Sequence, residues 1–325
     1  MRFTFRTAGE SHGRGLVVVV EGVPAGLAVS GASDIDPELR RRQGGYGRGD
    51  RMKIEQDRIE ILSGVRLGET IGAPIALLIW NRDWENWRIA MSPDAPGDDT
   101  AEADLRRVHL PRPGHADLVG VLKYGRDDAR DILERASARE TTARVAAGAV
   151  AKAFLRNLDV RIGSHIVRLG DVEAARPEAW PDDLNAAVDE SPLRTLDPDA
   201  ERRMIDAVDA AREDGDTLGG VFEVVATGLP AGLGSYVAWD RRLDGQHLRL
   251  RQAQQVLLEG VVPRGRFPRQ LLELGELHGA GVLLAGLGPR CLSGTSGSAR
   301  MCGDLVGDDA VARVFRVGQA QVLHG

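Results

Sequence analysis

The chain of 325 residues is poor in aromatic residues, lysine and cysteine. Its two cysteines, Cys291 and Cys302, have the spacing of neither a metal site nor a disulfide framework. No apolar run reaches the roughly 18 residues that a membrane span needs, and the first residues lack the apolar core of a signal peptide. The net charge of −6 argues against a nucleic-acid binder. These absences predict a cytoplasmic protein that binds no metal, nucleic acid or membrane.

Hydrophobic and charged residues make up 42% and 28% of the chain, which is typical of a globular protein. The length fits one large domain or two of ordinary size. Valine-rich or alternating segments predict strands, and capped segments with helical spacing predict helices. The expected strands are 16–21, 52–62, 74–80, 160–172 and 219–226, the first of them wholly buried. Helices are expected from Asp36, over 138–157 and over 199–213, with a long loop at 81–111.

Two valine-rich segments are each followed by a similar turn. The first turn is Gly-Val-Pro-Ala-Gly-Leu at 22–27, and the second is Gly-Leu-Pro-Ala-Gly-Leu at 228–233. Glycine and proline at these positions favour a tight change of direction. The similarity has two interpretations, an internal repeat of one strand-and-turn unit or chance.

Two histidines in glycine-flanked loops are the strongest functional signal. His12 lies in Gly-Glu-Ser-His-Gly at 9–13, and His115 lies in Arg-Pro-Gly-His-Ala-Asp at 112–117. An imidazole can transfer protons near neutral pH, and Asp117 is near enough in sequence to orient His115. Each histidine taken alone is equally compatible with a structural role. Ser11 also matches the Gly-x-Ser-x-Gly pattern of a hydrolase nucleophile, but that pattern sits between a strand and a following helix, and here a strand follows.

Arginines and glycines next to these histidines indicate binding of anions. Arg42 and Arg48 flank a glycine-rich loop, and a guanidinium group can bind phosphate or carboxylate through two parallel (bidentate) hydrogen bonds. The loop lacks the Gly-Lys-Ser/Thr of a phosphate-binding P-loop. Further along, Ser-Ala-Arg-Glu at 137–140 has the pattern of a capping box beside Arg135, and the start of a helix attracts anions. A solvated charge run and an ordinary helix start are the alternatives.

In this order and at this spacing, the motifs strongly resemble the chorismate synthase family. The matching stretches are 7–13, 42–49, 112–117, 134–141, 214–220 and 242–244. The resemblance covers residues 1 to about 245. It implies an α+β fold, a β-α-β sandwich of two pseudo-repeated halves, assembled as a homotetramer.

The resemblance also implies a lyase of the shikimate pathway, which leads to the aromatic amino acids. Such an enzyme converts 5-enolpyruvylshikimate 3-phosphate to chorismate by anti-1,4-elimination of phosphate and requires reduced FMN. His12 then protonates the departing phosphate, and His115 protonates the reduced flavin or tunes its charge. Arg135, Ala136 and Ser137 match a segment that binds FMN. Arg42 and Arg48 match positions that bind NADPH, the candidate flavin reductant, or here the substrate phosphate.

The resemblance ends abruptly after Asp244. The family continues with Asn-Arg-Ala-Gly-Gly, a Lys-Pro-Ile-Pro-Thr-type segment and Arg-Ser-Asp-x-Cys, none of which occurs in 246–325. Acidic residues outnumber basic ones before this boundary, and basic residues outnumber acidic ones after it. We therefore interpret 1–245 as an incomplete chorismate-synthase-like domain and 246–325 as a divergent or frameshifted tail. Two other hypotheses follow: an inactive remnant that binds phosphate ligands without turnover, and an anion or nucleic-acid binder that uses the arginine loop.

Overall fold

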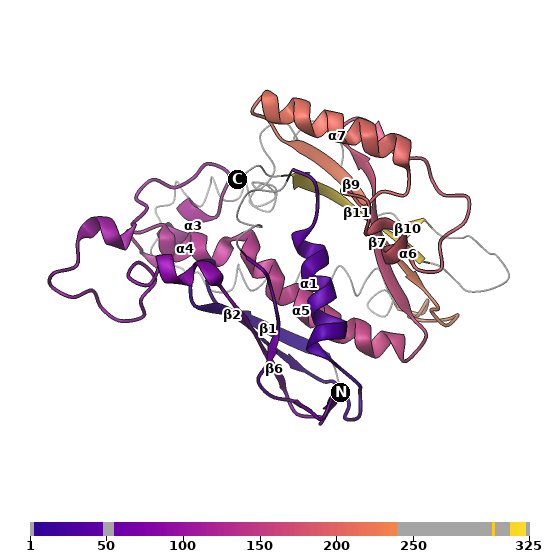
Figure 1. Cartoon of the computed structure of the whole chain (residues 1–325), viewed down its shortest axis with the longest axis horizontal. Coiled ribbons are helices and arrows are strands. Elements are labelled where there is room, and N and C mark those ends of the chain that lie inside the picture. Colours follow the sequence, from indigo (N-terminus) through magenta and orange to yellow (C-terminus); the bar gives the residue numbers. More distant parts are fainter. Residues whose placement is uncertain (1–2, 48–54, 239–300, 303–312, 323–325) are drawn as a thin grey trace.

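The computed structural model describes residues 3–47 and 55–238, together with the backbone of 301–302 and 313–322. Two antiparallel sheets enclose a pair of helices, α1 (Asp36–Gln43) and α5 (Thr141–Arg156), as Figure 1 shows. Helix α5 contacts a strand of each sheet. A helical layer between two sheets is the β-α-β sandwich that the resemblance implied, and the α+β class is thereby confirmed.

The first sheet has the strand order β1-β2-β6-β3. Its strands are β1 (Thr4–Ala8), β2 (Gly15–Glu21), β6 (Ile75–Trp80) and β3 (Glu60–Ile61). Burial alternates along β2 and β6, so that Val18 and Leu77 are fully buried while their neighbours are partly exposed. The prediction of a wholly buried strand at 16–21 is therefore wrong, because an antiparallel sheet covered on one side buries every second residue.

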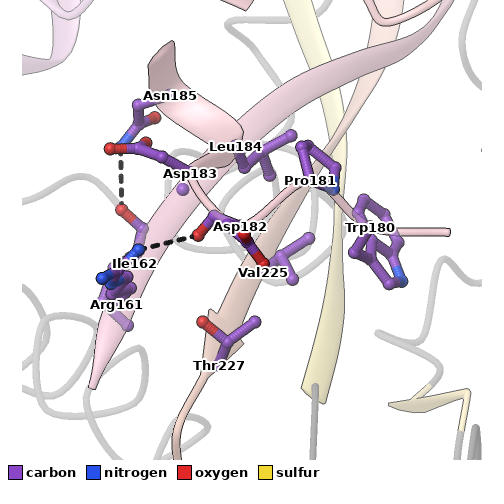
Figure 2. Close-up of a pocket in the computed structure, with 11 residues that line it drawn as sticks. Arg161, Ile162, Trp180, Pro181, Asp182, Asp183, Leu184, Asn185, Val225 and Thr227 are labelled. Carbon is purple, nitrogen blue, oxygen red and sulfur yellow. Dashed lines mark hydrogen bonds between the residues drawn. The ribbon is translucent and has the colours of Figure 1, made fainter. Parts of the chain in front are cut away.

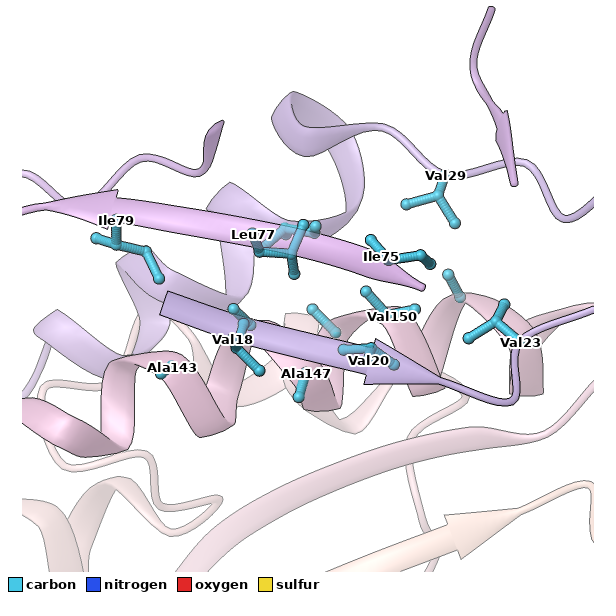
Figure 3. Packing of buried hydrophobic residues seen from close by; sticks show 14 of the residues in the cluster. Val18, Val20, Val23, Val29, Ile75, Leu77, Ile79, Ala143, Ala147 and Val150 are labelled. Carbon is cyan, nitrogen blue, oxygen red and sulfur yellow. The ribbon is translucent and has the colours of Figure 1, made fainter. Parts of the chain in front are cut away.

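Small residues let α5 approach the first sheet closely. Ala143, Ala147 and Val150 are completely buried and face Val18 and Val20 of β2 in Figure 3. The alanine-rich segment 138–157 was predicted to be such a helix. Gly148 of the same helix does not take part in this close packing, because a Cβ there would meet no atom of the described residues within 4 Å.

The second sheet has the strand order β10-β11-β9-β7-β8. Its strands are β7 (Arg161–Leu169), β8 (Val172–Glu173), β9 (Leu218–Thr227), β10 (Met301–Cys302) and β11 (Arg313–Val322). Helix α7 (Pro198–Glu213) lies on the side of this sheet away from α5 (Figure 1), and buries Met204 and Val208 in a core shared with Leu169. The predictions at 160–172, 199–213 and 219–226 are confirmed to within a few residues, and the tail contributes β10 and β11.

The glycines of the two similar turns have similar φ values. Gly22 and Gly26 have φ values of 83° and 83°, and Gly228 and Gly232 have values of 73° and 83°. All four lie in the left-handed region, which favours glycine. Each turn follows an inner strand of its sheet, β2 or β9. The likeness of sequence is thus a likeness of structure, which supports the internal repeat.

Segment 52–62 differs from its prediction. Within its described part, 55–62, only β3 is strand. Arg58 and Glu60 of the alternation are exposed, as the pattern predicts, but Glu55 is 1% exposed and nearby Asp57 is 3% exposed. Arg139 pairs with both carboxylates in the interior. The half-buried alternation therefore holds at 58–61, whereas buried ion pairs with Arg139 hold the part of the segment at 55–57.

The remaining elements are short. A π-helical turn, Gly31–Ile35, precedes α1, so Asp36 begins the helix rather than capping it and accepts a hydrogen bond from the Ile59 amide instead. The others are β4 (Val65–Arg66), β5 (Glu69–Thr70), α3 (Asp117–Tyr124), α4 (Arg130–Ala136), α6 (Leu184–Val188) and the 3-10 turns Arg82–Asn86, Glu102–Leu105 and Ala138–Glu140. Within the described part of the chain, no helix has the length and apolar character to cross a membrane.

Candidate active site

The loop that carries His12 joins β1 to β2 and has a fixed shape. Gly9 has a φ of 102°, and a Cβ there would lie 2.3 Å from the carbonyl oxygen of Gly15, so this position requires glycine. Asn81, at the end of β6, donates from Nδ2 to the carbonyl oxygens of Glu10 at 3.0 Å and Gly13 at 2.7 Å. Asn81 is 4% exposed. A buried amide therefore holds both ends of the histidine loop.

Glu134 of α4 holds the centre of the same loop. Its carboxylate oxygens lie 2.9 Å and 3.0 Å from Nδ1 of His12, and Oε2 accepts the backbone N–H of His12 at 2.8 Å. Arg130 donates to Oε1 at 2.8 Å. Burial raises the pKa of the Glu134 carboxyl, but the hydrogen bonds from His12 and Arg130 and the charge of His12 outweigh it and lower the pKa below 4.5. Glu134 is therefore a carboxylate at neutral pH.

Trp87, in the long loop after β6, forms one wall of the site. Its ring stacks on His12 with centroids 4.0 Å apart and an interplanar angle of 28°. Two guanidinium carbons also lie near the indole, that of Arg106 at 4.2 Å and that of Arg130 at 4.9 Å from the ring centroid. Such contacts between cations and an aromatic ring are attractive. An imidazole, two guanidiniums and a carboxylate are thus gathered around one indole ring.

The predicted FMN segment packs against the histidine loop. Arg135 donates to the carbonyl oxygens of Gly9 at 3.1 Å and Thr7 at 3.0 Å, and its side chain remains 41% exposed. Ser11 donates to Ser137 Oγ at 3.0 Å. The capping box is only half present: Ser137 accepts from the amide of Arg139 at 3.2 Å, but Glu140 accepts from Thr7 Oγ1 instead of closing the box.

Beneath this segment lies a buried ion cluster that the sequence did not reveal. Arg139 is 3% exposed and donates to Asn81 Oδ1 at 2.9 Å and to Asp57 Oδ1 at 2.6 Å. Its other terminal nitrogen lies 3.5 Å from Glu55. Because Asn81 also holds the His12 loop, the cluster connects that loop to segment 55–57.

Arg42 is occupied by protein groups. Its guanidinium donates to the carbonyl oxygen of Ala138 and to Thr141 Oγ1, both at 2.9 Å, and its side chain is 10% exposed. It therefore ties the end of α1 to the start of α5. Its predicted contact with NADPH or substrate phosphate stays a prediction. Arg48 lies outside the described residues.

His115 lies in an exposed loop just before α3. Its Nδ1 is 3.0 Å from the carbonyl oxygen of Pro113. Asp117, which is near enough in sequence to orient this ring, instead accepts from Nε and a terminal nitrogen of Arg112 at 2.9 Å and 3.1 Å. The reason is geometric, because Asp117 begins α3, is buried and takes the guanidinium that precedes it. Hydrogen bonds from Arg112 and its charge lower the pKa of Asp117 despite burial.

Helices α3 and α4 pack together, and they carry the groups next to the two histidines. Ile132 of α4 fills the space where a Cβ on Gly120 of α3 would be. His115 precedes α3, and Glu134 of α4 binds His12. The motifs of His12 and His115 predict that the two imidazoles converge on one pocket, and this stays a prediction.

A separate pocket lies at the second sheet. It is formed by β7, β9 and segment 180–185, with an empty volume of about 310 Å³ that includes open solvent. Figure 2 shows Trp180, Asp183 and Asn185 around it. Hydrogen bonds already engage its polar groups, since Asn185 donates to Ile162 O at 2.9 Å and Asp183 caps α6. None of the predicted site residues lines it.

The sequence motifs identify His12 but not the residues that position it. Trp87 lies in the loop 81–111, whose length was the only signal. Glu134 opens one of the quoted motifs, yet nothing in its neighbourhood pointed to His12, 122 residues away. The buried pairs of Asn81 and Arg139 likewise depend on contacts between residues 71 and 58 positions apart in the sequence.

The fold and the site define an α+β sandwich protein with a histidine–carboxylate pair among arginines. Residues 3–250 match the family model described as chorismate synthase. The chain is 59% identical over 242 residues to the chorismate synthase of Desulforudis audaxviator, covering 74% of this chain and 61% of that protein. It is 48% identical over 299 residues to the chorismate synthase of Chlorobium luteolum, and the match covers 90% of this chain and 74% of that protein. A crystal structure of chorismate synthase superposes with a TM-score of 0.61 at 41% identity, covering 78% of this chain and 66% of that one.

This chain belongs to the chorismate synthase family. It spans about three fifths of the length of the D. audaxviator relative and of the Carboxydothermus hydrogenoformans relative, to which it is 58% identical over 245 residues. All the predicted site residues, His12, Arg42, Arg48, His115 and 135–137, fall within the residues that the family model matches.

Proposed function

We propose that this chain carries out the reaction of its family, the anti-1,4-elimination of phosphate from 5-enolpyruvylshikimate 3-phosphate to give chorismate. The single observation that carries the proposal is the setting of His12, whose Nδ1 is bonded to ionised Glu134 while two guanidiniums lie nearby. A carboxylate can only accept, so Nδ1 holds a proton and Nε2 is the atom that exchanges one. That proton neutralises the oxygen of the departing phosphate.

The charges of the site suit an anionic substrate. The positive charge of Arg130 neutralises the negative charge of Glu134. The positive charges of Arg106 and of His12, when it is protonated, then attract the anionic substrate. Phosphate and carboxylate groups bind guanidiniums through charge-assisted hydrogen bonds. The protein as a whole is net acidic, so this local excess of positive charge is a property of the site.

The residues at 135–137 fit a cofactor that carries a phosphate. Arg135 offers a partly exposed guanidinium, and Ser137 offers a hydroxyl where the helical segment begins. Reduced FMN, when bound, supplies electron density to the carbon–oxygen bond that breaks. His115, exposed before α3, is proposed to hold or move a proton at the flavin. NADPH as the reductant, and the roles of Arg42 and Arg48 in binding it, are part of this proposal.

Assembly as a homotetramer is proposed from the family and from one surface. Leu118, Val119 and Leu122 of α3 are 54%, 51% and 50% exposed. Exposed apolar side chains grouped on one helix are typical of a subunit contact. Light scattering of the purified chain should give four times the mass of one chain, and a monomer would contradict the assembly. Cytoplasmic location is proposed from the biosynthetic role alone.

The test of the activity is anaerobic incubation of the full chain with photoreduced FMN and 5-enolpyruvylshikimate 3-phosphate. Release of phosphate and formation of chorismate are expected, and His12→Ala should reduce the rate by roughly 100-fold or more, as loss of a general acid does. His109→Ala, an exposed histidine of the loop before His115, is the matched control. No phosphate release from a chain with a folded circular dichroism spectrum would contradict the proposal and favour the inactive remnant.

A further inference from the structure

We propose that Glu134 is a positioning residue that fixes His12 in the tautomer with the proton on Nδ1. The inference deepens the proposed function and rests on it for its catalytic consequence. It assigns a role to a side chain that hydrogen-bonds to His12 and Arg130.

The geometry leaves the ring little freedom. Both carboxylate oxygens of Glu134 lie within 3.0 Å of Nδ1, and Oε2 also accepts the backbone N–H of His12. The carbonyl oxygen of Glu134 accepts the N–H of Ser11 at 2.9 Å. One residue therefore binds the backbone and the side chain of the same loop. Rotation of the imidazole about its bonds would break the contacts of both oxygens with Nδ1.

The surroundings of Glu134 keep it in the accepting form. Its side chain is 1% exposed, and Arg130 donates to Oε1, one of the two oxygens that lie near the ring. The imidazole is 19% exposed. A buried carboxylate that accepts from Nδ1 leaves Nε2 as the ring nitrogen available for proton transfer.

Glu134→Gln separates this role from simple filling of space. Glutamine has the same shape, but its amide offers one acceptor and one donor. It cannot accept from both Nδ1 and the backbone N–H of His12 with two oxygens, and it cannot pair with Arg130 as an ion. Glu38→Gln is the matched control, because Glu38 is also a carboxylate bonded to basic side chains, Arg41 and Lys152, but lies on α1 away from His12.

The first experiment reads the tautomer directly. Full-length chain labelled with nitrogen-15 in its 7 histidines is studied by long-range proton–nitrogen correlation, and His12→Gln identifies the His12 signals. Above its titration, His12 of the wild type and of Glu38→Gln should show the Nδ1–H form. Glu134→Gln should shift it toward the Nε2–H form. An Nε2–H form in the wild type, or an unchanged ratio in Glu134→Gln, would overturn the proposal.

The second experiment reads the catalytic consequence. In the anaerobic assay, Glu134→Gln should lower kcat by roughly 10- to 100-fold, the range found when an orienting partner of histidine is lost. KM should change little, and the pH dependence of kcat should shift. Full kcat in Glu134→Gln would overturn the catalytic part. An inactive wild type with an Nδ1–H ring would refute the proposed function alone, because the tautomer measurement needs no turnover.

Glu134→Asp keeps the proposal testable if the glutamine variant fails to fold. Aspartate keeps the charge but is one methylene shorter, so it cannot reach both the ring and the backbone N–H of His12. We expect a mixture of tautomers and a kcat between those of the wild type and the glutamine variant. A tautomer ratio equal to that of the wild type would count against the proposal.

Discussion

The indole of Trp87 stacks on the imidazole of His12, with ring centroids 4.0 Å apart. The same indole accepts the guanidiniums of Arg106 and Arg130 on its surface. One aromatic side chain therefore sets the plane of the proposed acid and gathers positive charge beside it. This relationship leads to the first prediction.

Trp87→Ala should reduce kcat/KM by roughly tenfold, because stacking contributes about 0.5–1.5 kcal/mol and each cation–π contact about 0.5–1 kcal/mol. Trp87→Phe should keep part of the activity, since a phenyl ring still stacks. Trp84→Ala, a half-buried tryptophan three residues earlier, is the control. Steady-state assays measure the effect. Equal losses in Trp84→Ala and Trp87→Ala would contradict a specific role for the stack.

The buried cluster of Arg139 should be important for stability. Arg139→Met would remove the guanidinium that pairs with the buried carboxylates of Asp57 and Glu55, and breaking a buried ion pair in this way typically costs about 3–5 kcal/mol. Arg144→Ala removes a surface ion pair with Glu140, which lies one helical turn earlier, and should cost only about 0.3–0.5 kcal/mol. Urea unfolding of the two variants measures the difference. Similar midpoints for both would show that the cluster contributes little.

Two glycine substitutions should have opposite effects. Gly9→Ala forces a Cβ to within 2.3 Å of a backbone oxygen at a φ of 102°, so it should destabilise the fold and disturb the His12 loop. Gly148→Ala meets no described atom within 4 Å and lies inside α5, so it should stabilise by about 0.5–1 kcal/mol. Thermal unfolding tests both. A stable, fully active Gly9→Ala variant would refute the strained loop.

The Arg112–Asp117 pair predicts a dependence of stability on pH. The folded-state pKa of Asp117 lies below 3.8, so the ionised carboxylate stabilises the fold above that value, and the effect disappears as pH falls through the folded-state pKa. Asp117→Asn should be less stable than the wild type at neutral pH, and the gap should close in acid. Urea midpoints measured from neutral to acidic pH test this, with Asp104→Asn, an exposed carboxylate, as the control. A constant gap would contradict it.

The frameshift interpretation of residues 246–325 makes a prediction about the gene. Resequencing the coding DNA should show that an adjacent frame after the codon of Asp244 encodes the Asn-Arg-Ala-Gly-Gly and Arg-Ser-Asp-x-Cys segments of the family. A sound frame, with neither segment in an adjacent one, would leave divergence as the explanation. The C. luteolum match covers 90% of this chain, so it extends in the present frame into 246–325, and it gives the sequence against which to align each frame.

Several features followed from the sequence because their causes are local. Valine-rich runs gave strands β2 and β9, alanine spacing gave α5, and the proline and glycines of the two turns gave their shared left-handed backbone. The motif around His12 likewise identified the proposed acid, since glycine flanks and an imidazole are visible in a short window.

Tertiary structure alone decided what those residues touch. Glu55 followed the pattern of a half-buried strand, but it and Asp57 pair with Arg139 in the interior. Asp117 stood two residues from His115, but it pairs with Arg112. Glu134 reaches His12 across 122 residues. Charged groups in a folded interior pair with whatever the packed layers bring near, and a local sequence pattern contains no record of that proximity.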